Sequence, residues 1–492
     1  MDHSEGATQL GPGGRDRFAF STWVFLRLLA VIHFIAFASF WSQLAGLVGP
    51  HGLLPAQPFF TAVREQLGSS AYGQLPSLCW IFGAGRFLDV LCAAGLGLSL
   101  LLFSGVAPAL CLALLWACYL SLLGAGQIFL NFQWDSLLLE ATLLAVFLAP
   151  WSLASLWQRA EPPRAARWLI WWLLFRLMFL SGAVKLTSGD PVWRNLTALA
   201  FHYETQPLPT ALAWYAHQLP LWAHRACGAV MFAVELAVPF LLFAPRALRH
   251  AAALLIAGLM LLIALTGNYT FFNLLTVALC VLCLDDAWWT RLLRRTPPLP
   301  ATTRFAPRWV FAPLAAFVVV FTFFQSAARL SRGAFQPTLY QSVERVVGPF
   351  RSLNSYGLFA VMTTTRPELI IEGSNDRREW LAYELPHKPG NLARRPGLVA
   401  PLQPRLDWQL WFAALETPAE NPWVFSLCDH LLRGTPEVLA LFATNPFPGQ
   451  PPRYLRVIRF EYHFTDPAGR ARTGDWWRRT PLDYFVEPTS LP

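Results

Sequence analysis

Long apolar runs recur along this sequence, and they restrict its fold more than any other feature does. Nine stretches are candidates for crossing a bilayer: residues 20–44, 79–103, 106–124, 136–150, 168–186, 226–244, 250–265, 270–284 and 309–326. A helix rises about 1.5 Å per residue, so about 20 apolar residues cross the hydrocarbon core. Of the 492 residues, 55% are hydrophobic and only 14% are charged, which is too apolar for a soluble protein of this length. The sequence therefore predicts a polytopic α-helical membrane protein.

Three of these runs are shorter than a straight span requires. They cover residues 136–150, 250–265 and 270–284. An alternative for the last two, which flank Gly267 and Asn268, is a re-entrant pair that enters the bilayer and returns to the same side. The protein then has nine spans, or seven spans and a re-entrant pair. Both counts are odd, so we expect the two ends of the chain on opposite sides of the membrane.

Arginine placement predicts the orientation, because cytoplasmic loops carry an excess of Lys and Arg. Most arginines near the spans lie in four segments: 15–17, 159–167, 246–249 and 291–308. If these are cytoplasmic, the outer loops before the last span keep little beyond Arg64, Arg194 and Arg225. This orientation makes 1–17 a cytoplasmic segment and 187–225 a large outer loop. The membrane is then the plasma membrane in a bacterium, which the bias of the basic residues toward arginine favours, or the endoplasmic reticulum membrane in a eukaryote.

Residues 327–492 differ in composition from the transmembrane part at 18–326. Proline and charged residues become frequent, and no run is long enough to span. Strands are predicted at 370–373, 380–385 and 454–464, and short helices at 422–432 and 436–443. We therefore predict a mixed, β-rich soluble domain over 327–492, on the extracytoplasmic side.

Ionisable residues inside the apolar runs are few and balanced in charge. The cations are Arg27, Arg86, Arg176 and Lys185, and the acids are Asp89, Asp135, Glu140 and Glu235. Lipid strongly penalises such charges unless they are paired or face a polar cavity. Arg86 and Asp89 are three residues apart and can pair on one helical face. Glu140 needs a buried partner, for which Arg27, Arg176 and Lys185 are the candidates.

Two clusters of polar and aromatic residues form the candidate functional motif. The first contains Gln133, Trp134, Asp135 and Glu140 at the start of a short span, and the second contains Arg176, Lys185, Asp190, Trp193, Arg194, His202, Tyr203, Glu204, Gln206 and Pro207. One interpretation is structural: Asp135 caps a helix, Lys185 extends toward the interface, and Trp and Tyr anchor the loop. The other is a site that reaches both lipid and water.

Several other classes of site lack their usual residues. Cys280 and Cys283 form a C-x-x-C inside an apolar run, where redox chemistry is not expected. The histidines near Glu204 have no standard metal-ligand spacing, so neither a metal nor a cofactor is predicted. No nucleophile elbow, phosphate loop or dinucleotide fingerprint occurs. The net charge of +9 follows from topology, so no nucleic-acid partner is predicted and the basic residues at 470–479 are expected on a solvated face.

The amino-acid sequences of the motif segments are specific. They include Phe-Gln-Trp-Asp at 132–135, Leu-Leu-Leu-Glu at 137–140, Ser-Gly-Ala-Val-Lys-Leu at 181–186, His-Tyr-Glu-Thr-Gln-Pro-Leu-Pro at 202–209, and segments 43–49, 52–55, 193–199, 214–220, 356–364, 371–374, 404–409 and 445–447. From about residue 20 to 465, the chain resembles the lipase maturation factor family. The resemblance implies a membrane-bound, non-enzymatic maturation or assembly factor. Its expected partners are membrane lipid and exported client proteins.

A shorter segment supports an alternative. Gly-Ala-Val-Lys-Leu at 182–186, followed by Trp193, is also similar to a motif of the vitamin K-dependent carboxylase superfamily. That likeness implies a membrane enzyme in which Lys185 is the base acting on a lipophilic substrate, with His202 and Glu140 assisting. The first resemblance covers far more of the chain, so a factor without catalytic activity is the preferred prediction.

Overall fold

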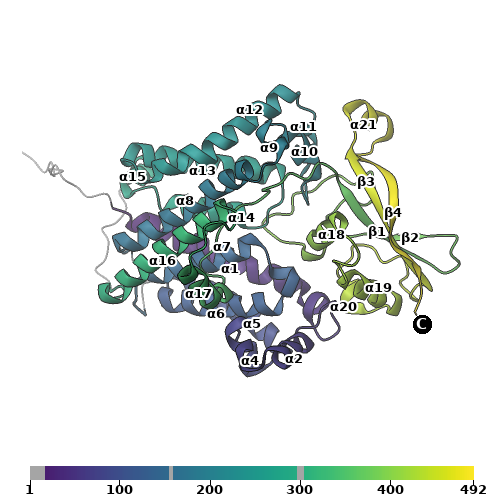
Figure 1. Cartoon of the computed structure of the whole chain (residues 1–492), viewed down its shortest axis with the longest axis horizontal. Helices are drawn as coiled ribbons and strands as arrows, with labels where there is room; N and C mark the ends of the chain where they lie inside the picture. Colours follow the sequence, from purple (N-terminus) through teal and green to yellow (C-terminus); the bar gives the residue numbers. More distant parts are fainter. Residues whose placement is uncertain (1–16, 154–158, 296–303, 492) are drawn as a thin grey trace, which may run out of the picture.

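The protein consists of a helical bundle with a small β-sheet packed against one end (Figure 1). The computed structural model describes residues 17–153, 159–295 and 304–491. The long helices run roughly along the bundle, and the sheet lies at the end where α10 and α11 are found. This arrangement agrees with a polytopic membrane protein that carries a C-terminal region with antiparallel strands.

Within the described residues, seven helices are long and apolar enough to cross a membrane. They are α1 (Ala19–Val48), α5 (Phe87–Ser104), α6 (Pro108–Ala125), α8 (Arg164–Thr187), the helix Leu221–Phe243, α13 (Arg246–Thr266) and α16 (Arg308–Leu330). The helix Leu221–Phe243 comprises α12 (Leu221–Phe232), a π-helical turn η3 (Ala233–Ala237) and η4 (Val238–Phe243). An eighth span is formed if the bent pair α14 (Phe272–Val281) and α15 (Asp286–Leu293) counts as one.

Shorter helices connect the spans. They are α2 (Ala56–Leu67), η1 (Gly68–Ser70), α3 (Ala71–Gln74), α4 (Cys79–Phe82), η2 (Gln127–Leu130), α9 (Pro191–Arg194), α10 (Ala198–Thr205) and α11 (Ala211–His217). Helix α7 (Gln133–Leu148) has only 16 residues and is largely buried among the other helices. Because it is shielded by protein, it can carry polar residues at a depth where lipid-facing helices cannot.

Two of the predicted spans have different bounds. Of the two alternatives for 250–265, the full span is confirmed and the re-entrant segment is wrong, because α13 is a helix of 21 residues, long enough to cross. Its first turn begins at Arg246 and contains charged residues, which are not counted in an apolar run. The run 250–265 is therefore shorter than the helix. The sharp bend of 102° falls instead between α14 and α15. The run 79–103 is likewise broken: α4 ends before Gly83, whose φ of +81° interrupts the helix, and α5 begins at Phe87.

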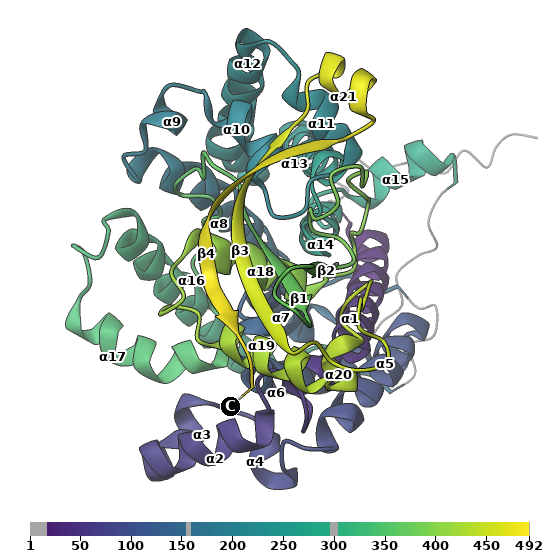
Figure 2. The same cartoon turned by 90° about the vertical axis from the view of Figure 1, so that its right-hand side faces the viewer.

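The C-terminal region contains an antiparallel sheet in the order β2-β1-β3-β4. The strands are β1 (Pro367–Ser374), β2 (Leu381–Tyr383), β3 (Tyr454–Phe464) and β4 (Trp477–Thr489). The helices of this region are α17 (Thr338–Val347), η5 (Gly348–Phe350), α18 (Arg405–Leu415), α19 (Trp423–Arg433), α20 (Pro436–Leu439) and α21 (Pro467–Thr473). Figure 2 shows the strands crossing the end of the bundle, with α21 beside α11. The central strand β1 is buried along its whole length, and α18 packs against it from the bundle side.

The predicted strands at 370–373, 380–385 and 454–464 all fall on strands of this sheet, but β4 was missed. The basic residues at 470–479 are predicted on a solvated face, and Arg478, Arg479 and Pro481 leave no apolar alternation that would indicate a strand. The backbone of β4 nevertheless pairs with β3, in a ladder with register shifts. The strand exists because β3 offers it a partner, which is a tertiary cause rather than a local one.

Candidate functional site

Four residues of the first motif contact the chain that follows α16. Gln133 exchanges hydrogen bonds with the backbone of Gly357, at 3.1 and 3.2 Å. The indole of Trp134 donates to Oε1 of Gln403 at 3.0 Å. Asp135 accepts from the amide of Phe132 at the start of α7, as a cap does, but it also lies 3.7 Å from Nη2 of Arg405. Together with the contacts described next, these form a buried interface between bundle and C-terminal region that we call the seam.

Glu140 is a fully buried acid of the seam. It forms an ion pair with Arg176, and its other oxygen accepts from the hydroxyl of Tyr356 at 2.6 Å and the amide of Asn354 at 2.9 Å. Arg176 in turn donates to the carbonyl of Asn354 at 2.7 Å. Both side chains of the pair are almost fully buried, at 0% and 1% exposure. Of the three partners considered from the sequence, Arg176 is therefore the one that neutralises Glu140.

Further residues of the second motif also contact the C-terminal region. Asp190 caps α9 through the amide of Val192 at 2.8 Å, and its second oxygen accepts from the amide of Met362 at 2.8 Å. The indole of Trp193 donates to the carbonyl of Phe359 at 2.9 Å. These contacts hold the loop after α8 against the irregular segment that precedes β1.

Arg366 fastens the stretch 204–207 to the sheet. Its guanidinium donates to the carbonyls of Glu204 and Gln206, at 2.5 Å each, and of Pro207 at 2.9 Å. Glu368 balances its charge at 2.8 Å and is shared with Lys388. Burial lowers the pKa of Arg366, an effect that Glu368 opposes.

Glu204 completes this part of the seam from the other direction. Its carboxylate accepts from the amide of Phe464 at 2.6 Å and from Nδ1 of His463 at 2.9 Å. The peptide carbonyl and the side chain of this one residue therefore both bind the C-terminal region.

A second feature lies beside the seam. A cavity of about 530 Å³ opens between α8, α10, the helix Leu221–Phe243, α13 and α14, and most of its lining is aliphatic or aromatic. We call it the apolar cavity. Its polar lining consists mainly of Lys185, Glu235, His202, Tyr269 and Asn273. A pocket of this size, with few polar groups, suits a ligand that is largely apolar.

Lys185 and Glu235 form an ion pair in the wall of the apolar cavity. The ammonium donates to both carboxylate oxygens, at 2.9 and 2.8 Å, and lies 5.3 Å from the ring centroid of Trp193. Glu235 is carried by the π-helical turn η3, and Gly182 allows this turn to approach α8, because a Cβ there would lie 2.9 Å from Cβ of Glu235. A π-helical turn often marks a functional position.

His202 and Tyr269 are uncharged at neutral pH. The Tyr269 hydroxyl donates to Oε1 of Gln206 at 3.0 Å, and Nε2 of His202 lies 3.2 Å from it. Since the only hydroxyl proton is used, Nε2 of His202 must be the donor toward Tyr269. Burial, together with the charge of Lys185, lowers the pKa of His202 to about 4, and burial raises the pKa of Tyr269.

Comparison with known protein families identifies the family of this chain. The model of the lipase maturation factor transmembrane domain matches residues 20–291, and the model of the lipase maturation factor C-terminal domain matches residues 352–487. This chain belongs to the lipase maturation factor family. Human lipase maturation factor 2 is 36% identical to it, over 95% of this chain and 82% of the human protein. Mouse lipase maturation factor 1 is 34% identical, over 95% of this chain and 87% of the mouse protein. No solved structure matches.

In this family member, most motif residues are therefore structural links between two matched domains. Removing one partner of such a buried charged contact generally costs about 3–5 kcal/mol, because the other charge is left unpaired. No sequence pattern identifies Tyr356, Arg366, Gln403 and Arg405 as the C-terminal partners of these residues. Segments 356–364 and 404–409 do carry the family resemblance, but their amino-acid sequences do not indicate which residues of the bundle they bind.

The structure brings some expected residues together and separates others. Lys185, His202 and Tyr203 line the apolar cavity, whereas Glu140, the third residue of the proposed catalytic set, lies in the seam. The expected pair of Arg86 and Asp89 is not formed among the described residues. Asp89 instead accepts from the indole of Trp41 at 2.8 Å, and Arg86 is exposed.

Two further residues lie apart from the site. Arg27 lies over the ring of Trp23, 4.6 Å from its centroid. Arg194 is exposed on α9. The carboxylase-like alternative gains no support from the family comparison, and its lysine has both of the Glu235 oxygens as partners.

Proposed function

We propose that this protein is a maturation and assembly factor for exported lipases, with its C-terminal region presented to clients on the extracytoplasmic side of the membrane. The observation that carries the proposal is the match of both domains, in the same order, to proteins named lipase maturation factors. Lipases are proposed as the clients because the relatives are named lipase maturation factors. The seam supports a mechanism in which the membrane bundle holds the sheet in one fixed orientation.

The ends of the bundle support the proposed orientation. At the end opposite the sheet, Arg246 pairs with Asp285 at 2.5 Å, and the backbone of Arg17 accepts from the amide of Asp286. The arginine-rich segments around 17, 246 and 291 therefore gather at one end, which suits a cytoplasmic face. The bacterial plasma membrane and the membrane of the endoplasmic reticulum both allow this arrangement.

Secretion of a client lipase tests the function. We would express a secreted lipase with the wild-type protein, without it, and with Arg366→Leu, and measure lipase activity in the medium and crosslinked complexes in the membrane. Wild type should raise the secreted activity and crosslink to the lipase, and Arg366→Leu should reduce both. Arg472→Leu, an exposed arginine in α21, is the control. Equal secretion with and without the protein would refute the proposal.

Reporter fusions test the orientation separately. A phosphatase that is active only outside the cytoplasm, fused after residue 492, should be active, and a fluorescent reporter that folds only in the cytoplasm should not fluoresce there. The opposite pattern would place the C-terminal region in the cytoplasm and remove exported clients from the proposal.

A further inference from the structure

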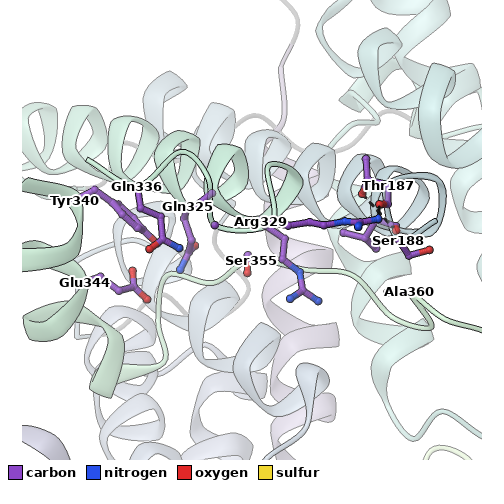
Figure 3. A pocket seen from close by; sticks show the side chains of 13 residues that line it. Thr187, Ser188, Gln325, Arg329, Gln336, Tyr340, Glu344, Ser355 and Ala360 are labelled. Carbon is purple, nitrogen blue, oxygen red and sulfur yellow. Dashed lines mark hydrogen bonds between the residues drawn. The ribbon is translucent and has the colours of Figure 1, made fainter. Parts of the chain in front are cut away.

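A second cavity, of about 540 Å³, lies where α8 and α16 end (Figure 3). Helix α8 ends at Thr187 and α16 at Leu330, so the cavity lies at the level where both spans leave the membrane. The amphipathic helix α17 forms another wall with Tyr340 and Glu344. We call this the interfacial cavity. It is separate from the apolar cavity, with no lining residue in common.

Opposite charges line the interfacial cavity without neutralising each other. Arg329 is exposed, and its guanidinium has no hydrogen bond or ion pair with any part of the chain that the structure describes. Oε2 of Glu344 is buried and has no hydrogen-bond partner in the described chain, although the carboxylate also interacts with the hydroxyl of Tyr340 one turn earlier. In the view of Figure 3, the two side chains lie on either side of Gln325.

Gln325 adds a second unsatisfied acceptor. Its side chain is only 8% exposed, and its Nε2 donates to the carbonyl of Leu353 at 3.2 Å, which fixes the orientation of the amide. Its Oε1 has no partner among the residues described, and Gln325 is part of the lining of the interfacial cavity. A buried acceptor without a donor is costly, so a ligand that supplies N–H or O–H groups would be stabilised here.

The surroundings of the interfacial cavity are suited to lipid chains. Phe323 on α16, Phe335 in the following turn, and Leu339 and Val346 on α17 are exposed apolar side chains, and Leu339 is 78% exposed. An amphipathic helix with exposed apolar residues beside the end of a span typically lies in the bilayer interface. A ligand in the cavity would therefore have its polar part among charges and its apolar part beside these side chains.

We propose that the interfacial cavity binds the headgroup of phosphatidylethanolamine. The phosphodiester is placed at Arg329, with Arg332 next to it, and the primary ammonium at Glu344 and Oε1 of Gln325. Both acceptors require hydrogen-bond donors, which ethanolamine has and the trimethylammonium of choline lacks. An anionic lipid without an amine, such as phosphatidylglycerol, would satisfy the arginines but would bring no cation to Glu344. The cavity therefore selects a zwitterion with a primary ammonium group.

Native mass spectrometry of the purified full-length protein tests this site. The protein would be equilibrated with phosphatidylethanolamine, phosphatidylcholine or phosphatidylglycerol of identical chains. One phosphatidylethanolamine should be retained per chain, with about tenfold preference over phosphatidylcholine, as expected for one charged hydrogen-bonding contact. Glu344→Gln should abolish this preference, and Arg329→Gln should weaken retention of all three lipids.

Matched controls keep the result interpretable. Arg64 and Glu65 on α2 are exposed, so Arg64→Gln and Glu65→Gln should retain lipid as wild type does. Equal retention of the ethanolamine and choline lipids, or an unchanged preference in a folded Glu344→Gln protein, would overturn the proposal. Soluble glycerophosphoethanolamine distinguishes the source: if it binds as tightly as the lipid, the ligand is a free zwitterion and the membrane-lipid assignment is wrong.

Discussion

The guanidinium of Arg366 donates a hydrogen bond to the carbonyl oxygen of Gln206, 160 residues earlier in the chain. The contact joins the start of the sheet to the loop that follows α8, and the side chain of Gln206 in turn binds Tyr269 at the edge of the apolar cavity. The position of the sheet and the shape of the cavity therefore depend on the same short stretch of backbone.

We predict that Arg366→Leu destabilises the junction by about 3–5 kcal/mol, because Glu368 and three backbone carbonyls lose a buried charged partner. Thermal unfolding in detergent should show a lower midpoint, and limited proteolysis should cut within 204–209 or before β1. Arg472→Leu should behave as wild type. Identical proteolysis of the two variants would show that Arg366 does not hold the junction.

Glu140 and Arg176 should be strongly coupled. Each single change, Glu140→Leu or Arg176→Met, leaves the other charge buried and unpaired. The first change should therefore be strongly destabilising, and adding the second change to a single variant should cost less stability than the first change did. A double-mutant cycle on the unfolding midpoint measures this coupling. Additive effects would mean that the two charges are satisfied independently, for example by Tyr356 and Asn354.

Substitutions of Lys185 distinguish a structural role of this residue from a catalytic one. Lys185→Arg preserves the charge opposite Glu235 but has no readily titratable amine, so client lipase secretion should be retained. Lys185→Met leaves Glu235 unpaired and should lower both stability and secretion. If Lys185→Arg folds with wild-type stability and yet loses function, the carboxylase-like enzyme alternative becomes the better explanation.

The low pKa of His202 predicts acid sensitivity. The folded protein keeps this histidine neutral down to about pH 4, whereas an unfolded chain protonates it near about pH 6.5. The unfolded state therefore binds the extra proton first, and stability is lost as the pH falls from about 6.5 toward 4. Unfolding midpoints between pH 7.5 and 4.5 should fall less steeply for His202→Asn than for wild type. Parallel curves would contradict the assigned cause.

The site shows how far residue types alone can be interpreted. Glu140 was recognised as an acid that requires a buried cation, and Arg176 was among three candidates, because the cost of an unpaired charge in lipid is independent of the fold. The choice among the three required the distances. Arg366 lies outside the quoted segments and Arg405 is only one residue of segment 404–409, since an arginine in a polar region has no local feature that distinguishes a buried link from a solvated charge.

Hydropathy by itself determined that this chain crosses a membrane many times, because burying a span depends on the sum of transfer energies over consecutive residues. It also indicated a separate composition after the last span. Only the tertiary structure decided that α13 is a full span, that β4 pairs with β3, and that Arg329 and Glu344 share a cavity without pairing. These outcomes depend on which groups meet across hundreds of residues, and side-chain charge and hydrogen bonding act over a few ångströms of space rather than along the sequence.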